Sequence, residues 1–244
     1  MKVLICPDIH GRHFWKKPNI EDFDKVIFLG DYLDHYGGET NTEGELEVQI
    51  TLDSSIKNFE EIIQLAKDNP DKVVLLLGNH DLPYFSKEYG KALNYWCRHD
   101  YKNHDKIAKL FNDNKGLFKI AWECENRKMK RVLFTHAGVT KDFQQICGLS
   151  AETINTYFLN ESFKDIPNIV GLAAVSFYRG GYQKFGSPVW ADVREHISDP
   201  VTDVYQIFGH TYSRDAIVTE NFAMLDRGDS CYVLEEDKLY QWKP

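Results

Sequence analysis

Short hydrophobic runs that end abruptly in polar residues recur along the chain. Three of them lie in the first third, at residues 2–6 (KVLIC), 25–30 (KVIFLG) and 73–77 (VVLLL). Their length and their β-branched residues are typical of buried strands. Residues 45–68 have hydrophobic positions near helical spacing and stop before Asn69 and Pro70, which predicts a helix between the second and third strands. Alternating strands and helices indicate an α/β fold built in layers.

The rest of the chain changes character three times. Residues 82–116 are rich in aromatic and charged residues and predict helices without a strand, whereas residues 117–138 read as two strands around a turn. A more irregular, helical section at 140–200 precedes further strands at residues 204–212, 216–226 and 230–242. No internal repeat or low-complexity linker interrupts the chain. We therefore expect a single domain over residues 1–244, with a helical insertion at about 82–116.

Composition excludes several classes of protein. Of the 244 residues, 43% are hydrophobic and 27% are charged, which is ordinary for a globular protein. The five cysteines form no CxxC pair, which argues against a disulfide framework and for a reducing compartment. A net charge of −8 disfavours binding to long nucleic acids. No apolar run approaches the ~20 residues that span a bilayer, and the first strand is too short for a signal peptide. We expect a cytoplasmic protein without membrane contact.

Five of the predicted strands end in side chains that can bind a metal ion. A single His or Asp in such a place is more often a turn or capping residue. Five such ends are hard to assign to turns, because adjacent strand ends in a layered sheet converge. Imidazoles, carboxylates and an amide held together would leave buried polar groups unpaired unless a cation joined them. The mixture of His nitrogen with Asp and Asn oxygen suits manganese, iron or zinc. The residues are Asp8, His10, Asp31, Asp34, Asn79, His80, Asp81, His136 and His210.

These strand ends carry a resemblance to a known family. The motifs PDIHGR, LGDYLDHYGG, LGNHD, THAG and GHT, in this order, resemble those of the calcineurin-like metallophosphoesterases. They span residues 8 to 211. The DIHG and THAG motifs and the single final His are most similar to the phosphoprotein phosphatase branch, which includes Ser/Thr phosphatases and symmetrical dinucleoside-tetraphosphate hydrolases. The resemblance implies a four-layer αββα sandwich of two packed mixed β-sheets.

The resemblance also implies a role for each motif residue. Asp8 and His10 would hold a first metal ion, Asp31 would bridge two ions, and the second would be held by Asn79, His136 and His210. The cofactors would be two divalent transition metal ions, with manganese favoured over iron or zinc. A hydroxide between the metals would attack phosphorus directly. His80 would protonate the leaving oxygen, and Asp34 would orient it. The alternative for His80 is a third ligand or a core histidine.

Two positions depart from the family pattern. Tyr212 stands where many members have a second histidine. The phosphoprotein phosphatase branch commonly lacks this histidine. His35 stands where that branch has an arginine that binds the substrate phosphate, so it is the candidate substrate-binding residue. An imidazole cannot form the bidentate contact of a guanidinium. Three arginines could supply the missing charge, and the sequence does not rank them: Arg12, Arg179 and Arg194.

The aromatic segment at residues 84–106 has two interpretations. It could overhang the site and select substrates, or it could form a helical pair that packs its aromatic residues into the core. For Tyr95 and Trp96 we expect the second.

Three functions remain open at this point. The first is a phosphomonoesterase of the Ser/Thr protein phosphatase type, acting on a phosphorylated substrate. The second is hydrolysis of a dinucleoside tetraphosphate, or of a small-nucleotide phosphodiester. The third is a non-catalytic binding module on the same scaffold, which would predict lost ligands or a lost His80–Asp34 pair. None of these residues is missing, so an enzyme is expected.

Overall fold

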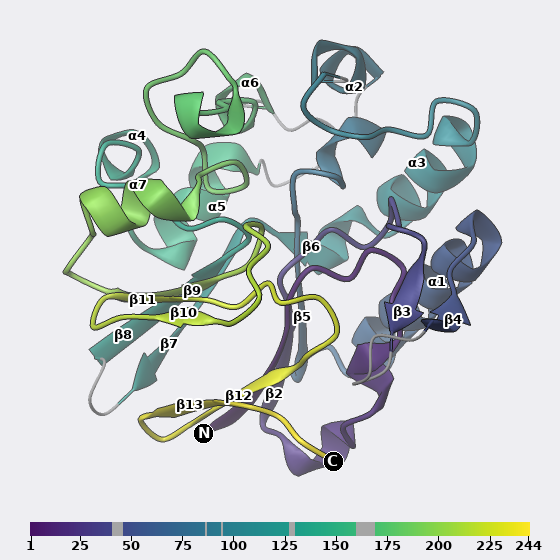
Figure 1. Cartoon of the computed structure of the whole chain (residues 1–244), viewed down its shortest axis with the longest axis horizontal. Coiled ribbons are helices and arrows are strands. Elements are labelled where there is room, and N and C mark those ends of the chain that lie inside the picture. The colour runs from purple at the N-terminus through teal and green to yellow at the C-terminus, as the bar shows by residue number, and fades with distance from the viewer. Residues whose placement is uncertain (41–45, 86, 94, 127–129, 160–168) are drawn as a thin grey trace.

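Two mixed β-sheets form the centre of the protein (Figure 1). The computed structural model describes residues 1–40, 46–85, 87–93, 95–126, 130–159 and 169–244. Within these residues the strand order is β13-β12-β1-β2-β5-β6 in the first sheet and β10-β11-β9-β8-β7 in the second. The first sheet comprises β1 Lys2–Cys6, β2 Lys25–Phe28, β5 Val73–Leu76, β6 Phe118–Lys119, β12 Tyr232–Glu235 and β13 Lys238–Gln241. The second comprises β7 Ala121–Asn126, β8 Lys130–Thr135, β9 Tyr205–Phe208, β10 Ile217–Val218 and β11 Phe222–Met224.

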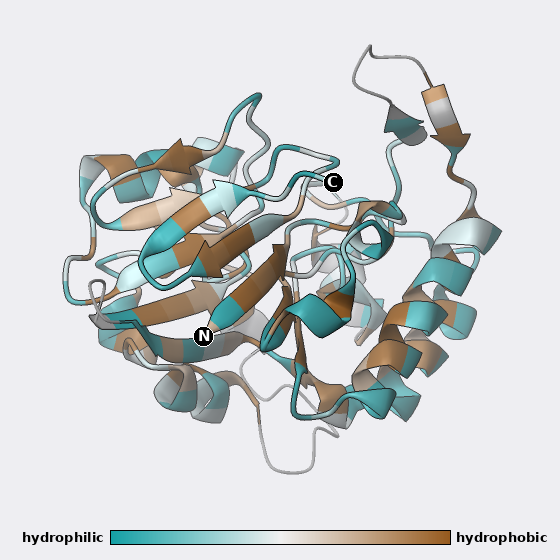
Figure 2. Cartoon of the chain, turned by 90° about the horizontal axis from the view of Figure 1, so that it is seen from below, coloured by the Kyte–Doolittle hydropathy of each residue, from teal (hydrophilic) through white to brown (hydrophobic). Residues whose placement is uncertain are grey.

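The two sheets bury both of their faces. Alternate residues of a strand point to opposite faces, so in β1 Val3 and Ile5 join the cluster between the sheets, whereas Leu4 and Cys6 face the helices. The second sheet supplies Val132, Phe134, Ile207 and Ala223 to the same inter-sheet cluster. Figure 2 shows that the central strands are mainly hydrophobic, while the peripheral helices carry both hydrophobic and hydrophilic residues. The predicted mixed α/β fold with two packed sheets is confirmed.

Seven α-helices lie outside the sheets within the described part of the chain. Helix α1 buries a hydrophobic face that includes Ile56, Phe59 and Ile63 in the core cluster on the helix side of the first sheet. Among the described residues, every helix is too short or too polar to span a bilayer. The helices are α1 Leu52–Asp68, α2 Lys87–Leu93, α3 His104–Asp113, α4 Gln144–Cys147, α5 Ala151–Phe158, α6 Ile169–Leu172 and α7 Val193–Ser198.

The predicted helix at 45–68 is wrong at its N-terminal end. Leu46–Gln49 forms strand β4, which pairs with β3 (Gly38–Thr40). The helix begins only after Thr51, whose hydroxyl accepts from the Ser54 N–H while the Ser54 hydroxyl accepts from the Thr51 N–H. This reciprocal cap fixes the helix start. The alternation of apolar residues before it belongs to a strand.

The described residues of 82–116 contain helices, as the sequence predicts, with turns and irregular backbone at 95–103 and no strand among them. The hairpin turn expected between β7 and β8 includes residues 127–129, which lie outside the described residues. The organisation of the chain as a single domain stays a prediction.

Helix α7 supports the loop after β8 through one buried histidine. His196 Nε2 donates to the Ala137 carbonyl oxygen at 3.0 Å, and its ring packs on Phe208 with the centroids 4.6 Å apart. Gly138 is required here for two reasons. A Cβ at this position would lie 2.5 Å from His196 Nε2, and the residue has a φ of +84°, which residues other than glycine rarely adopt. Burial lowers the pKa of His196 to about 4.

We expect His196 to make the protein less stable in mild acid. Below its ordinary pKa of 6.5, the unfolded chain binds a proton here that the folded protein does not bind until about pH 4. Stability is therefore complete above pH 6.5 and falls as the pH is lowered, with a loss of about 2 kcal/mol by pH 5. His196→Gln keeps a donor for Ala137 but cannot titrate. Urea unfolding of the metal-free proteins at pH 7 and pH 5 should show a smaller loss in the variant; equal losses would contradict this role.

Candidate metal centre and active site

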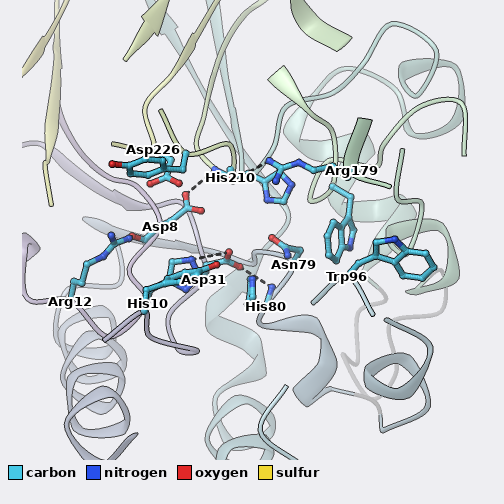
Figure 3. Close-up of a pocket in the computed structure, with 13 residues that line it drawn as sticks. Asp8, His10, Arg12, Asp31, Asn79, His80, Trp96, Arg179, His210 and Asp226 are labelled. Atoms are coloured by element: carbon cyan, nitrogen blue, oxygen red, sulfur yellow. Dashed lines mark hydrogen bonds and ion pairs between the residues drawn. The ribbon is translucent and has the colours of Figure 1, made fainter. Parts of the chain in front are cut away.

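The ends of five strands from both sheets meet at one place. Strands β1, β2 and β5 run parallel in the first sheet, and β8 and β9 run parallel in the second. Hydrogen bonds join the sheets there: His136 Nδ1 donates to the Leu29 carbonyl at 2.8 Å, and the His210 N–H donates to Asp8 Oδ1 at 2.9 Å. Residues that follow these strands, among them Asp8, Asp31 and Asn79, line a cavity of about 480 Å³ (Figure 3). The predicted convergence is therefore present in the structure.

Most of the strained backbone in the described chain lies at this cavity. Five residues other than glycine have a positive φ, and four of them are predicted site residues: His10 at 45°, Asp31 at 54°, Asp34 at 60° and His210 at 67°. The fifth is Glu236. Asp and His adopt this conformation more often than most residues, but it persists only where the surroundings enforce it. The loops after the strands thus hold four predicted site residues in a left-handed backbone, and three of them, His10, Asp31 and His210, line the cavity.

Two glycines allow the loops to approach the carboxylates. A Cβ on Gly78 would lie 2.2 Å from Asp31 Oδ1, and a Cβ on Gly209 would lie 2.2 Å from Asp8 Oδ1. Gly78 is therefore needed for this close approach. A side chain at either position would displace a carboxylate from the cavity.

Asp81 fastens the loop after β5 to the loop after β2. Its Oδ2 accepts from the N–H groups of Asp31 at 2.9 Å and Gly78 at 2.8 Å, and its Oδ1 accepts from the Tyr32 N–H at 3.0 Å. The side chain is fully buried. Asp81 thus supports the loop, and its oxygens are engaged by backbone N–H groups.

Asp31 lies between two histidines whose hydrogen bonds fix their tautomers. His10 Nδ1 donates to the Leu33 carbonyl at 2.9 Å, and His136 Nδ1 donates to the Leu29 carbonyl. In each neutral ring the Nε2 lone pair is then left as an acceptor. Both Nε2 atoms lie 3.5 Å from Asp31 Oδ2. One carboxylate oxygen therefore faces two imidazole lone pairs without a proton between them.

Further acceptor atoms lie close to His136. His136 Nε2 lies 2.9 Å from Asn79 Oδ1 and 3.1 Å from His210 Nδ1. His210 Nε2 is buried and has no hydrogen-bond partner, so whichever nitrogen carries its proton, one polar atom is left unsatisfied. Converging buried acceptors repel one another unless a cation binds them. The residues present fit a metal ion here.

Electrostatics prepares the same residues for metal binding. Burial lowers the pKa of both His10 and His210 well below the ordinary value, so both rings are neutral near pH 7. Burial raises the pKa of Asp31, but the three imidazoles around it, those of His136, His80 and His10, outweigh burial and lower it overall. Neutral imidazoles and an ionised carboxylate are the forms that bind metal ions.

His80 is held by a carboxylate rather than by a backbone carbonyl. Its Nδ1 lies 3.1 Å from Asp34 Oδ2, and the Tyr84 hydroxyl donates to Asp34 Oδ1 at 2.8 Å. Burial lowers the pKa of His80, but Cys97, Asp31 and Asp34 together raise it well above its ordinary value. The structure therefore favours the protonated ring, which can donate a proton into the cavity.

Two of the three candidate arginines line the cavity. Arg12 donates to the Asp8 carbonyl at 2.6 Å. Arg179 donates to the His210 carbonyl at 3.2 Å and to Thr211 Oγ1 at 2.7 Å. Both guanidinium groups are thereby held beside the acidic and imidazole residues (Figure 3).

Arg194 and His35 are not among the described residues that line the cavity. Arg194 is directed away, to the Asp192 carboxylate and the Tyr178 carbonyl. His35 Nδ1 accepts from the Gly37 N–H at 3.3 Å. The position of its ring favours Arg12 and Arg179 over His35 as the groups that face a bound anion.

The expectation that Tyr95 and Trp96 pack into the core is wrong for Tyr95, which is 85% exposed. Trp96 is half-buried: it packs against the main hydrophobic core and also lines the cavity. Tyr212, which stands where many family members have a second histidine, lines it as well, as do Tyr36 and Trp190, which the sequence analysis did not identify. Helical spacing cannot tell an aromatic residue that faces a core from one that faces a cavity, so only the tertiary structure places them.

Asp226 is a further site residue that sequence reasoning missed. It is buried and lines the cavity beside Asp8 (Figure 3). Burial and the neighbouring Asp8 raise its pKa well above the ordinary value. Asp226 follows strand β11 closely, so the signal that found the other carboxylates, a hydrophobic run ending in Asp, was present in the sequence.

Comparisons with known proteins agree with this geometry. A family model described as calcineurin-like phosphoesterase matches residues 1–214. The structure is similar to a cold-active protein-tyrosine phosphatase of a psychrophile, Shewanella sp., with 16% identity over 98% of this chain and 77% of that one, and a TM-score of 0.55. It is also similar to a protein serine/threonine phosphatase from Saccharomyces cerevisiae, with 12% identity over 100% and 80% of the chains and a TM-score of 0.55. At such identities the likeness concerns the fold. No curated protein sequence matches significantly.

Proposed function

The chain belongs to the calcineurin-like phosphoesterase family, and from this premise we propose that it is a dinuclear metal-dependent phosphomonoesterase of the Ser/Thr protein phosphatase type. Family membership makes it a metallophosphoesterase, a hydrolase that acts on phosphoric esters. The resemblance of its DIHG, THAG and GHT motifs to the phosphoprotein phosphatase branch supports the finer assignment.

One observation carries the proposal: two groups of buried metal-binding side chains share Asp31. His10, Asp31 and His80 form one group, and Asp31, His136 and His210 form the other, with the ligand atoms of each within 4.8 Å of one another. A single carboxylate between two groups is what two neighbouring dications require, because they repel unless an anion lies between them.

In the proposed enzyme, Asp8, His10 and Asp31 hold the first ion. Asn79 and His136 hold the second with Asp31, and His210 joins them through Nδ1. The mixed nitrogen and oxygen donors favour manganese, with iron or zinc as alternatives. When bound, the ions lower the pKa of a water molecule and neutralise charge on the phosphoryl group.

The remaining residues bind the substrate and move a proton. Arg12 and Arg179 face the cavity with fixed guanidinium groups, which suit the phosphoryl oxygens. His80 donates a proton from Nε2 to the leaving oxygen, while Asp34 holds Nδ1–H and stabilises the charged ring. Direct hydrolysis in this arrangement needs no phosphorylated side chain.

Metal removal tests the proposal. We expect the chelated, metal-free protein to lose hydrolysis of p-nitrophenyl phosphate, because the proposed ions supply the activated water and neutralise the phosphoryl charge. Adding Mn²⁺ should restore activity, and titration should saturate at two ions per chain. Elemental analysis before and after chelation provides the control. Full activity in a protein shown to be metal-free would contradict the proposal, and saturation at one ion would contradict a dinuclear centre. A phosphopeptide, which is a phosphomonoester, should then be cleaved faster than a dinucleoside tetraphosphate or a cyclic nucleotide.

A further inference from the structure

Four aromatic residues are among those that line the cavity, and we call them together the aromatic wall: Tyr36, Trp96, Trp190 and Tyr212. Tyr36 is 67% exposed and Tyr212 is 72% exposed. Single exposed aromatic residues are common on protein surfaces, but several gathered at one cavity indicate a binding site. Because the metal-binding residues account for recognition of the phosphoryl group, the aromatic wall is left to contact another part of the substrate.

The indole of Trp96 is held in place. Its Nε1 donates to the Gly180 carbonyl at 2.9 Å, and its ring meets those of Tyr95 and Tyr182 edge-on, with centroids 5.5 and 5.6 Å away. A ring fixed before binding loses little conformational entropy when a ligand stacks on it. Trp96 thus offers a preorganised surface.

Tyr36 is held by Arg98, which lies in the same segment of the chain as Trp96. The guanidinium carbon of Arg98 lies 3.7 Å from the centroid of the Tyr36 ring. Arg98 also donates to the carbonyl oxygens of Asp34 and His35, which precede Tyr36. Residues 82–116 therefore supply Trp96 directly and hold Tyr36 through Arg98.

Both rings lie near the residue that protonates the leaving group. Tyr36 meets the His10 ring edge-on at 4.7 Å between centroids, and His10 meets the His80 ring at 5.1 Å. On the other side, Cys97, the neighbour of Trp96, interacts with the His80 side chain. In Figure 3, His80 lies between His10 and Trp96. Tyr36, His80 and Trp96 line the same cavity, so the group bonded to the oxygen that His80 protonates lies within the cavity that both rings line.

Resting on the proposed function, we propose that the site selects phosphomonoesters whose leaving group carries a planar aromatic ring, which stacks on Tyr36 and Trp96. Aromatic pairs gain free energy beyond the area they bury, and a saturated group of the same size does not. The ring can be bonded directly to the ester oxygen, as in an aryl phosphate, or separated from it by a sugar, as in a nucleotide. Both sources share the chemistry that the aromatic wall recognises.

Binding of non-hydrolysable analogues tests the proposal without relying on catalysis. Benzylphosphonate and cyclohexylmethylphosphonate have the same carbon number and differ in the planarity of the ring. Calorimetry with the manganese-loaded protein should give a dissociation constant about threefold to tenfold lower for benzylphosphonate. A second pair, the phosphonate analogues of adenosine 5′-phosphate and ribose 5-phosphate, tests a ring beyond a sugar. A preference in only one pair identifies the source of the ring.

Variants assign the preference to the two residues. Tyr36→Leu and Trp96→Leu should each reduce the ratio of the two dissociation constants towards one. Tyr240→Leu alters a partly exposed tyrosine on β13, far from the cavity, and should keep the wild-type ratio. Equal affinities within both pairs in the wild-type protein would overturn the inference, as would ratios unchanged in both leucine variants. A protein that shows the ring preference but hydrolyses no phosphomonoester would refute the proposed function and leave the ring site standing.

Discussion

An Asp31→Asn variant is expected to fold normally and to lose hydrolysis of p-nitrophenyl phosphate by more than ~100-fold. Changes to the outer partners of metal ligands already cost about 10–100-fold, and Asp31 is the carboxylate common to both groups of ligands. Its Oδ2 lies 3.5 Å from the Nε2 atoms of His10 and His136. A neutral amide removes the negative charge between the proposed ions, so metal affinity should fall together with the rate.

The fold should tolerate this substitution for local reasons. Asp31 has a φ of 54°, and asparagine is among the residues that accept this conformation best. The backbone N–H of residue 31 remains bound to Asp81, and the amide oxygen can still accept from the His80 N–H in place of Asp31 Oδ1. Loss of activity would therefore report on the site and not on folding.

The measurement needs three readouts on one preparation. These are the steady-state rate, the metal content by elemental analysis, and the urea midpoint of the metal-free protein. Asp203→Asn, at an exposed carboxylate, is the matched control and should keep wild-type values. Wild-type activity in Asp31→Asn would contradict the assignment of this residue as the shared ligand.

The strand ends could be predicted because their signal is local. A buried strand is a short hydrophobic run, and the polar residue that follows it is visible in the sequence whatever the strand pairs with. The runs before Asp8, Asp31, Asn79, His136 and His210 all became parallel strands whose ends converge. The same pattern precedes Asp226, so the position of this carboxylate is also encoded locally in the sequence.

Other features depend on contacts between distant segments. The left-handed backbone at His10 and His210 follows from the packing of whole loops, which no local pattern specifies. The choice between core and cavity for Trp96 depends on its hydrogen bond to Gly180, a residue 84 positions away. Likewise, Arg12 and Arg179 could be separated from Arg194 only by where their side chains point.

The strand at Leu46–Gln49 shows how two periodicities can overlap. Leu46, Val48 and Ile50 alternate as in a strand, yet with the helix that follows they also fit helical spacing over a longer window. The reciprocal cap between Thr51 and Ser54 separates the two elements. This Thr-x-x-Ser pair marks the boundary between strand β4 and helix α1, because a capped start takes precedence over an extended hydrophobic pattern.

His80→Ala is expected to lower kcat by a factor on the order of 10²–10⁴ and to leave the metal content unchanged. The competing interpretation is that His80 is a ligand, since it lies in one group with His10 and Asp31. Its Nδ1 is engaged by Asp34 at 3.1 Å, and its neighbours raise its pKa well above the ordinary value. A ring that holds a proton this firmly is suited to donate it and is a poor metal ligand.

The choice of substrate separates a proton donor from a residue that only supports the site. p-Nitrophenolate leaves readily without protonation, whereas an alkoxide leaves poorly unless a proton reaches it. His80→Ala should therefore lose much more activity on an alkyl phosphate than on p-nitrophenyl phosphate, and Asp34→Asn should show the same order with smaller losses. Equal losses on both substrates would contradict proton donation, and loss of metal from His80→Ala would make the residue a ligand. Because a merely structural defect lowers both rates alike, the ratio between the substrates decides the role of His80.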